Sequence, residues 1–163
     1  ASILTFLNTV AAQILDDNSL VENHTFLDWC LQYDELPEAT QYSVQYLLAN
    51  ADTDDCHEAN QTLTTQTRLR NRGPSVQGDF RPFASLTAVT DIKVTLLAQF
   101  ISGADFTPLN NLPALEKLEV VGRVHDLTPF SVLGNLDDLT ITSYASSGEP
   151  SLQDLSPLSS LGS

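Results

Sequence analysis

The stretch Asp79-Phe80-Arg81-Pro82-Phe83 sets a pattern that recurs three more times along the chain in one shared frame. Each copy reads aspartate, apolar residue, any residue, proline, apolar residue, and each has a leucine three positions further on. The other copies begin at Asp105, Asp126 and Asp154, and the leucines are Leu86, Leu112, Leu133 and Leu161. A unit that returns in one frame predicts an array of similar supersecondary elements.

A strand-like pattern follows the first three copies. The shared form L-x-x-L-x-L is found in Val89-x-x-Ile92-x-Val94, Leu115-x-x-Leu118-x-Val120 and Leu136-x-x-Leu139-x-Ile141. The last two apolar positions alternate, which places them on one face of a short strand, pointing into the core. Prolines cannot donate a hydrogen bond to a sheet, so we expect them in a turn or short helical return. One such coil cannot bury its own apolar side, and neighbouring coils must therefore stack.

The spacing of the copies is uneven. Their prolines lie 26, 21 and 28 residues apart, at Pro82, Pro108, Pro129 and Pro157. The two longer units carry extra residues at 96–104 and 144–153, which we expect to form loops on one side of the array. A degenerate unit is expected to precede the first regular one, with residues 67–69 as its strand.

The first 63 residues have a helical pattern instead. Apolar residues recur at steps of three and four in 1–17, and further helices are expected over 24–33, from Pro37 to Ala51, and from Cys56 to about Leu63. Pro37 and Glu38 suit a first helical turn, and residues 52–55 supply turn and capping side chains. The sequence thus predicts a helical N-terminal cap over 1–63 and a repeat region over 64–163.

The formal charge of −14 is unevenly distributed. Residues 1–67 contain eleven acidic and no basic side chains, whereas residues 68–163 contain ten acidic and seven basic ones. A strongly anionic body repels nucleic acid and anionic lipid, so neither is expected as a partner. The apolar runs are too short for a membrane span, and no membrane insertion is expected.

The two cysteines, Cys30 and Cys56, both lie in the helical part. A disulfide between them is the favoured interpretation and would indicate an oxidising compartment. Two free buried thiols remain the alternative, because cysteine also behaves as a small core hydrophobe.

No arrangement of residues typical of an enzyme is found. The histidines (His24, His57 and His125) form no spaced metal-binding pair, and no serine lies in a nucleophile-elbow motif. His57 and Glu58 beside Cys56 could hint at a thiol nucleophile, but a disulfide-bonded cysteine at a helix start is the simpler interpretation. We expect no catalytic residue, no metal and no cofactor.

The repeats resemble the bacterial, internalin-like class of short leucine-rich repeats over residues 64–163. The segment Phe26-Leu27-Asp28-Trp29-Cys30, with Cys56-His57-Glu58-Ala59 and Leu63, is similar to the N-terminal region of secreted or periplasmic cyanobacterial leucine-rich-repeat proteins. That resemblance implies a binding scaffold with a disulfide-stabilised cap and no assigned chemistry. This sequence departs from the pattern in its long insertions and in lacking the asparagine that usually follows the strand.

The predicted fold is therefore an α/β solenoid: a leucine-rich repeat of about four coils, the last one incomplete, with an N-terminal α-helical cap and a short parallel sheet on its concave face. Residues beside the buried strand positions should point outward and form a binding surface. These candidates are Arg68, Arg70, Asp91, Lys93, Thr95, Lys117, Glu119, Val121, Arg123, Asp138, Thr140, Thr142 and Tyr144. They include five of the seven cations, which could attract an acidic partner.

The expected function is non-catalytic recognition of an unidentified protein or glycan, by a secreted, periplasmic or cell-surface protein. The alternative is a structural end module of a longer surface protein. On that hypothesis the chain would continue, or form a homodimer, through an open C-terminal repeat.

Overall fold

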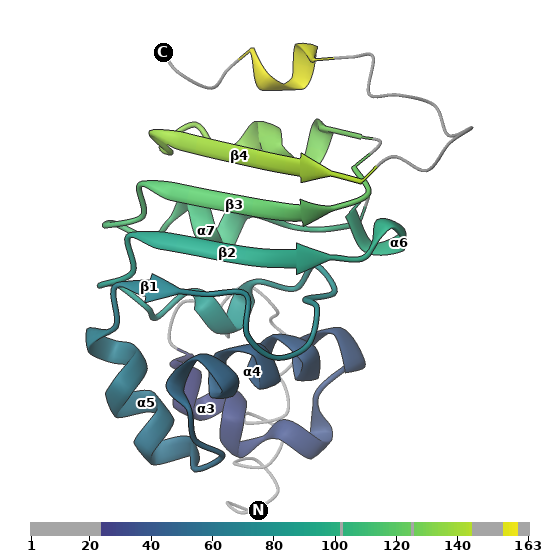
Figure 1. Cartoon of the computed structure of the whole chain (residues 1–163). Coiled ribbons are helices and arrows are strands. Elements are labelled where there is room, and N and C mark those ends of the chain that lie inside the picture. The colour runs from purple at the N-terminus through teal and green to yellow at the C-terminus, as the bar shows by residue number, and fades with distance from the viewer. Residues whose placement is uncertain (1–23, 102, 125, 145–154, 160–163) are drawn as a thin grey trace, which may run out of the picture.

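The computed structural model describes residues 24–101, 103–124, 126–144 and 155–159. Figure 1 shows a layer of helices at one end of a parallel sheet, with the strands stacked in chain order away from it. Several predictions fall outside the described residues. They are the helix over 1–17, the surroundings of His125, most of the insertion at 144–153, and the open C-terminal repeat.

The helical layer consists of α3 (Phe26–Leu31), η1 (Tyr33–Glu35), α4 (Glu38–Ala51) and α5 (Cys56–Thr65). Local capping explains where these helices begin. The Thr25 hydroxyl accepts from the Asp28 N–H while the Asp28 carboxylate accepts from the Thr25 N–H, and the Asp55 carboxylate accepts from the Glu58 N–H. The helices predicted near 24–33, 37–51 and 56–63 are confirmed.

The sheet contains β1 (Arg68–Leu69), β2 (Asp91–Leu96), β3 (Lys117–Gly122) and β4 (Asp138–Ser143), all parallel and in the order β1-β2-β3-β4. Ile92, Leu118 and Leu139 are register partners, and so are Val94, Val120 and Ile141. These side chains lie on the inner face, fully buried in β2 and β3 and half-buried in β4. The predicted inward positions of the strands are confirmed.

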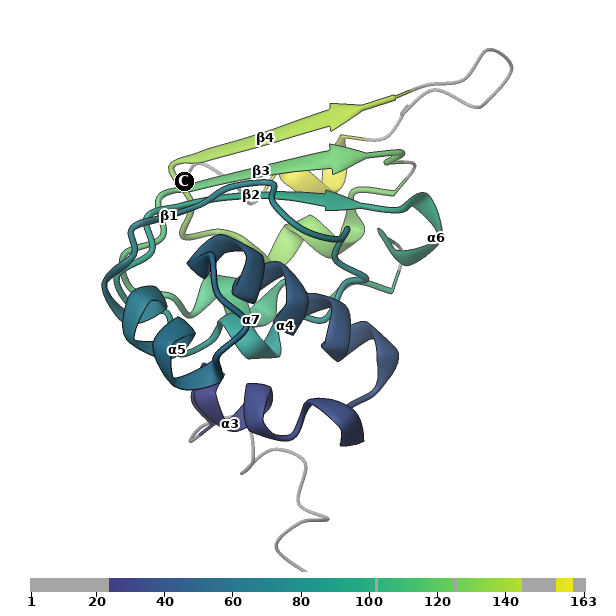
Figure 2. The ribbon, with the colours of Figure 1, turned by 60° about the horizontal axis from the view of Figure 1, so that its bottom comes forward.

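Helical returns pack against the inner face of the sheet (Figure 2). They are η2 (Arg81–Phe83), α7 (Thr107–Asn110), η3 (Thr128–Val132) and η4 (Ser156–Leu158), whereas α6 (Ala98–Ile101) lies beyond the carboxyl end of β2 (Figure 1). Each return has a proline in its first two positions, so the prolines lie outside the sheet as predicted. The motif aspartates act as caps, because Asp79, Asp105 and Asp126 each accept a hydrogen bond from the backbone N–H two residues later.

A stack of phenylalanine rings forms the centre of the core. Phe80 and Phe106 have centroids 4.9 Å apart, and Phe106 and Phe130 have centroids 4.7 Å apart, in both cases nearly parallel. Phe83 contacts Phe80 and also Tyr46 of α4. The helical layer and the sheet therefore share one continuous hydrophobic core.

The predicted leucine-rich-repeat solenoid is wrong for this structure, which is a small α/β fold with one four-stranded all-parallel sheet. Regular coils need strands and returns of equal length, and these differ. β1 has two residues where β2, β3 and β4 have six, and the returns are partly α-helical and partly 3₁₀. The insertion at 96–104 adds helix α6 after β2, while the described chain between β3 and η3 has no such helix, so the repeated motif specifies a turn and a strand without a uniform coil.

Cys30 and Cys56 form a disulfide that joins α3 to the start of α5, with their Cα atoms 5.7 Å apart. The favoured interpretation of the two cysteines is thereby confirmed. The bond fastens two helices that contribute to the same core.

Reduction should lower the free energy of unfolding by about 3.5 kcal/mol, because the bond closes a loop of 26 residues' separation. Denaturant titrations with and without reductant measure this difference. The double variant C30A/C56A is the control and should not respond to reductant. Alkylation of both thiols in the unfolded, unreduced protein would contradict the bond.

Gly122 is the last residue of β3, and its Cα lies close to the backbone of β2. A Cβ atom at this position would collide with the Leu96 carbonyl oxygen. Gly122→Ala should therefore destabilise the protein by about 1–3 kcal/mol, as expected for overpacking. Gly103→Ala is the matched control, because a Cβ there meets nothing within 4 Å, and it should change stability by less than about 0.5 kcal/mol. Equal effects in thermal unfolding would show that the close approach at Gly122 is not a constraint.

Candidate functional site

One face of the sheet has no described element packed on it, because all the helical returns lie on the other (Figure 2). The alternating strand positions point their side chains onto this open face. The residues predicted to face outward in β2, β3 and β4 do share it, in three rows across the strands. The rows are Asp91, Lys117 and Asp138; Lys93, Glu119 and Thr140; and Thr95, Val121 and Thr142.

Charges alternate in sign where the strands begin. Arg68, Asp91, Lys117 and Asp138 are successive register partners from β1 to β4. The Lys117 Nζ lies 3.9 Å from the Asp138 carboxylate, and in the next row the Lys93 Nζ lies 2.8 Å from the Glu119 carboxylate. The predicted basic strip is thus interleaved with acids over this part of the face. Such partly exposed pairs contribute little to stability, so they can exchange partners at small cost.

The carboxyl ends of the strands have a different character. A hollow of about 470 Å³ lies there. Its lining is Thr95, Leu96, Leu97, Gln99, Gly122, Arg123 and Tyr144. Tyr144 is 61% exposed and Leu97 is 45% exposed, so apolar surface is available beside hydroxyl, amide and guanidinium groups.

The segment after β1 borders this end of the sheet and is held firmly. The Arg70 N–H donates to the buried Asn50 carboxamide oxygen at 2.7 Å, and the Gln66 amide donates to the Arg68 carbonyl at 2.9 Å. The Asn71 amide donates to the Thr95 hydroxyl at 2.7 Å, which links the segment to the lining of the hollow. Arg68, Arg70 and Arg72 are all exposed on this ordered backbone.

The alternating pattern of the strands predicted the residues of the open face, but it did not predict all the residues that line the hollow. Val121 points to the outer side yet is only 8% exposed, so it offers less contact surface than expected. Leu97, Gln99, Asn71 and Arg72 were not among the candidates. They follow the last strand residue, where the alternating pattern gives no orientation. An exposed leucine directly after a strand was the one available signal for the hollow.

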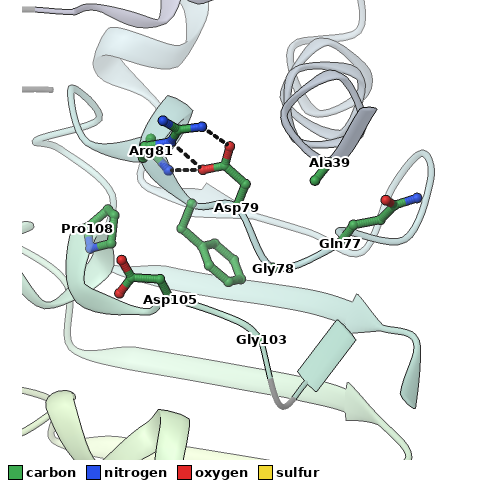
Figure 3. A pocket seen from close by; sticks show the side chains of 9 residues that line it. Ala39, Gln77, Gly78, Asp79, Arg81, Gly103, Asp105 and Pro108 are labelled. Carbon is green, nitrogen blue, oxygen red and sulfur yellow. Dashed lines mark hydrogen bonds and ion pairs between the residues drawn. The ribbon is translucent and has the colours of Figure 1, made fainter. Parts of the chain in front are cut away.

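A second hollow, of about 280 Å³, lies between α4 and the returns (Figure 3). Two of its charged residues, Asp79 and Arg81, form a forked ion pair at 2.8 Å, and the Thr40 hydroxyl also donates to Asp79 at 2.6 Å, while the third, Asp105, accepts from the Thr107 N–H. Arg81 lies over the Trp29 ring, 5.3 Å from its centroid. These groups satisfy one another and fasten α4 to η2, which is a structural role.

The candidate chemistry around Cys56 is not available, because its sulfur is in the disulfide. His57 and Glu58 are exposed on α5, and Asp55 caps that helix. Over the residues that the structure describes, no three His, Cys, Asp or Glu side chains are grouped to hold a metal ion.

The pH dependence of stability should reveal the Asp79–Arg81 pair. Burial raises the pKa of Asp79, but hydrogen bonds from Arg81 and Thr40 and the Arg81 charge outweigh it, so the folded pKa lies below the usual value. A group whose pKa is lower in the folded than in the unfolded state stabilises the protein at pH values above its unfolded pKa, here about 3.9. This stabilisation is lost as the pH falls through the folded pKa.

Asp79→Asn should therefore lower the free energy of unfolding by about 1–2 kcal/mol at neutral pH, and the difference from wild type should shrink below about pH 3. Urea titrations at both pH values measure it. Asp105→Asn is the control: it occupies the corresponding position one unit later, forms no ion pair within the described part of the chain, and should cost less. A difference that is independent of pH would contradict the role of the Asp79 charge.

No protein-family model, no curated protein and no solved structure matches this chain. The resemblance to secreted leucine-rich-repeat proteins therefore remains untested, and the function has to be inferred from the residues of the open face.

Proposed function

We propose that this chain is a non-catalytic recognition module that binds another macromolecule, a protein or a glycan, through the open face of its parallel sheet. The observation that carries the proposal is the combination of an uncovered sheet face with a hollow at the carboxyl ends of its strands. Residues of β2 and β3 and of the segments that follow β2, β3 and β4 line this hollow.

The composition of the face suits recognition. It offers hydroxyls from Thr95, Thr140 and Thr142, ion pairs that can reorganise, and the ring of Tyr144. Tyrosine and arginine are enriched where proteins bind partners tightly. No nucleophile paired with a base was found in the sequence, and Cys56 is bonded, which favours binding over catalysis.

The disulfide supports a location outside the cytoplasm, in the secreted, periplasmic or surface-exposed class, because such bonds persist in oxidising compartments. Among the described residues, no helix is long and apolar enough to cross a membrane. The net charge of −14 argues against nucleic acid as the partner.

Thr140 provides the test, because it lies on the face in β4 and is exposed. Ligands selected from a random peptide display library and from a glycan array should lose affinity at least about ten-fold for Thr140→Arg, since a bulky charge there blocks the surface. Titration calorimetry measures the change.

Gln61→Arg is the matched control, because Gln61 is exposed on α5, away from the sheet, and its substitution should leave affinity unchanged. Selected ligands that bind Thr140→Arg as well as wild type would overturn the proposal. An absence of any selected ligand would favour the alternative, a structural end module.

A further inference from the structure

We infer that the carboxyl-end hollow binds an acidic oligosaccharide, a chain of uronic-acid units, with its carboxylates on the arginines and a sugar ring against Tyr144. The inference rests on the proposed function and names the class of ligand. Three observations carry it: the distribution of charge along the strands, the ordered presentation of the arginines, and the lining of the hollow.

Charge is polarised along the strand direction. The described segments at the carboxyl ends of the strands, 70–78, 95–101, 103–104, 121–124 and 142–144, contain Arg70, Arg72 and Arg123 and no acidic residue. The amino ends instead contain four acidic residues, Asp91, Glu116, Asp137 and Asp138, against two basic ones, Arg68 and Lys117. In a chain with 21 acidic and seven basic residues, Arg70 and Arg72 in described segments without an acidic residue make a local cationic site.

Arg70 and Arg72 are available to a ligand. Both are exposed, and neither forms an ion pair with any residue of the described chain. Their backbone is fixed by the Asn50 and Asn71 hydrogen bonds, and Gly73, at a φ of 77°, packs closely against Ala49. An ordered backbone reduces the entropy that binding would cost.

The lining favours a saccharide over a peptide strand. A peptide that extends a sheet pairs with the backbone of an edge strand, but most of the lining comes from β2, β3 and the residues after them, and these interior strands already pair with neighbours; only Tyr144 follows the edge strand β4. Recognition at this end must come from side chains. Thr95 and Gln99 can bond sugar hydroxyls, and the exposed faces of Tyr144 and Leu97 suit the apolar face of a pyranose.

The distance from Arg70 and Arg72, after β1, to Tyr144, after β4, calls for an oligomer. Four neighbouring strands extend over roughly 14 Å, so one monosaccharide cannot contact both the segment after β1 and the residues after β4. Guanidinium groups bind carboxylates through paired hydrogen bonds, so repeated carboxylates along one chain match this arrangement.

The test uses a short oligogalacturonate as the probe and its fully methyl-esterified form as the neutral control. Calorimetry should show binding of the acid form that weakens between about 0.15 M and 1 M salt as the Debye length falls. The affinity should drop about ten-fold in the double variant R70Q/R72Q and in Tyr144→Ala. Gln61→Glu, which also makes the net charge more negative but lies exposed on α5 outside the sheet, should bind as wild type does. Circular dichroism of each variant confirms that it is folded.

Several outcomes would overturn the inference. They are no binding of the acid form, equal binding of the ester, an equal loss in Gln61→Glu, or tighter binding of a polyglutamate peptide with the same dependence on Arg70 and Arg72. If any of these occurs while Thr140→Arg still abolishes binding of other selected ligands, the recognition module stands and only its ligand class is wrong.

Discussion

The structure depends on a row of polar side chains along α4 that satisfies backbone groups of the first strand units. Ser43 donates to the Asp79 carbonyl, Tyr46 donates to the Lys93 carbonyl at 2.6 Å, and Asn50 accepts from the Arg70 N–H. All three are buried, and burial also raises the pKa of the Tyr46 hydroxyl. An unpaired buried backbone group costs free energy comparable to a lost hydrogen bond. Because the side chains of α4 satisfy these backbone groups, the helix can pack against the β1 edge of the parallel sheet.

That contact also determines where the arginines lie. Asn50 holds Arg70 where β1 stops after two residues, and Gly73 then turns the chain close to Ala49. The short first strand is therefore a consequence of docking on α4. It leaves Arg70 and Arg72 beside the carboxyl end of β2, where Asn71 reaches Thr95.

Much of this architecture was predictable from sequence, for local reasons. Alternation identified the inward positions of β2 and β3, and the motif prolines identified the returns, because both are properties of a few adjacent residues. The prediction of a regular solenoid was wrong. Uniform coils require strands and returns of constant length, and the repeated motif does not determine these lengths. The pairing of Lys93 with Glu119 and of Lys117 with Asp138 was also missed. It follows from the register between strands, which no single strand's sequence reveals.

The charge of the whole chain and the charge of the hollow act over different distances. At low ionic strength the Debye length is about 30 Å, and the body of −14 repels any polyanion that approaches. Near 0.15 M salt it falls to about 8 Å, so an approaching ligand responds mainly to the nearest groups, which at the carboxyl ends of the strands are arginines. An acidic protein can therefore bind an acidic ligand, provided that its cations are gathered where no carboxylate neutralises them. Arg70 and Arg72, which form no ion pair with the described residues, meet that condition.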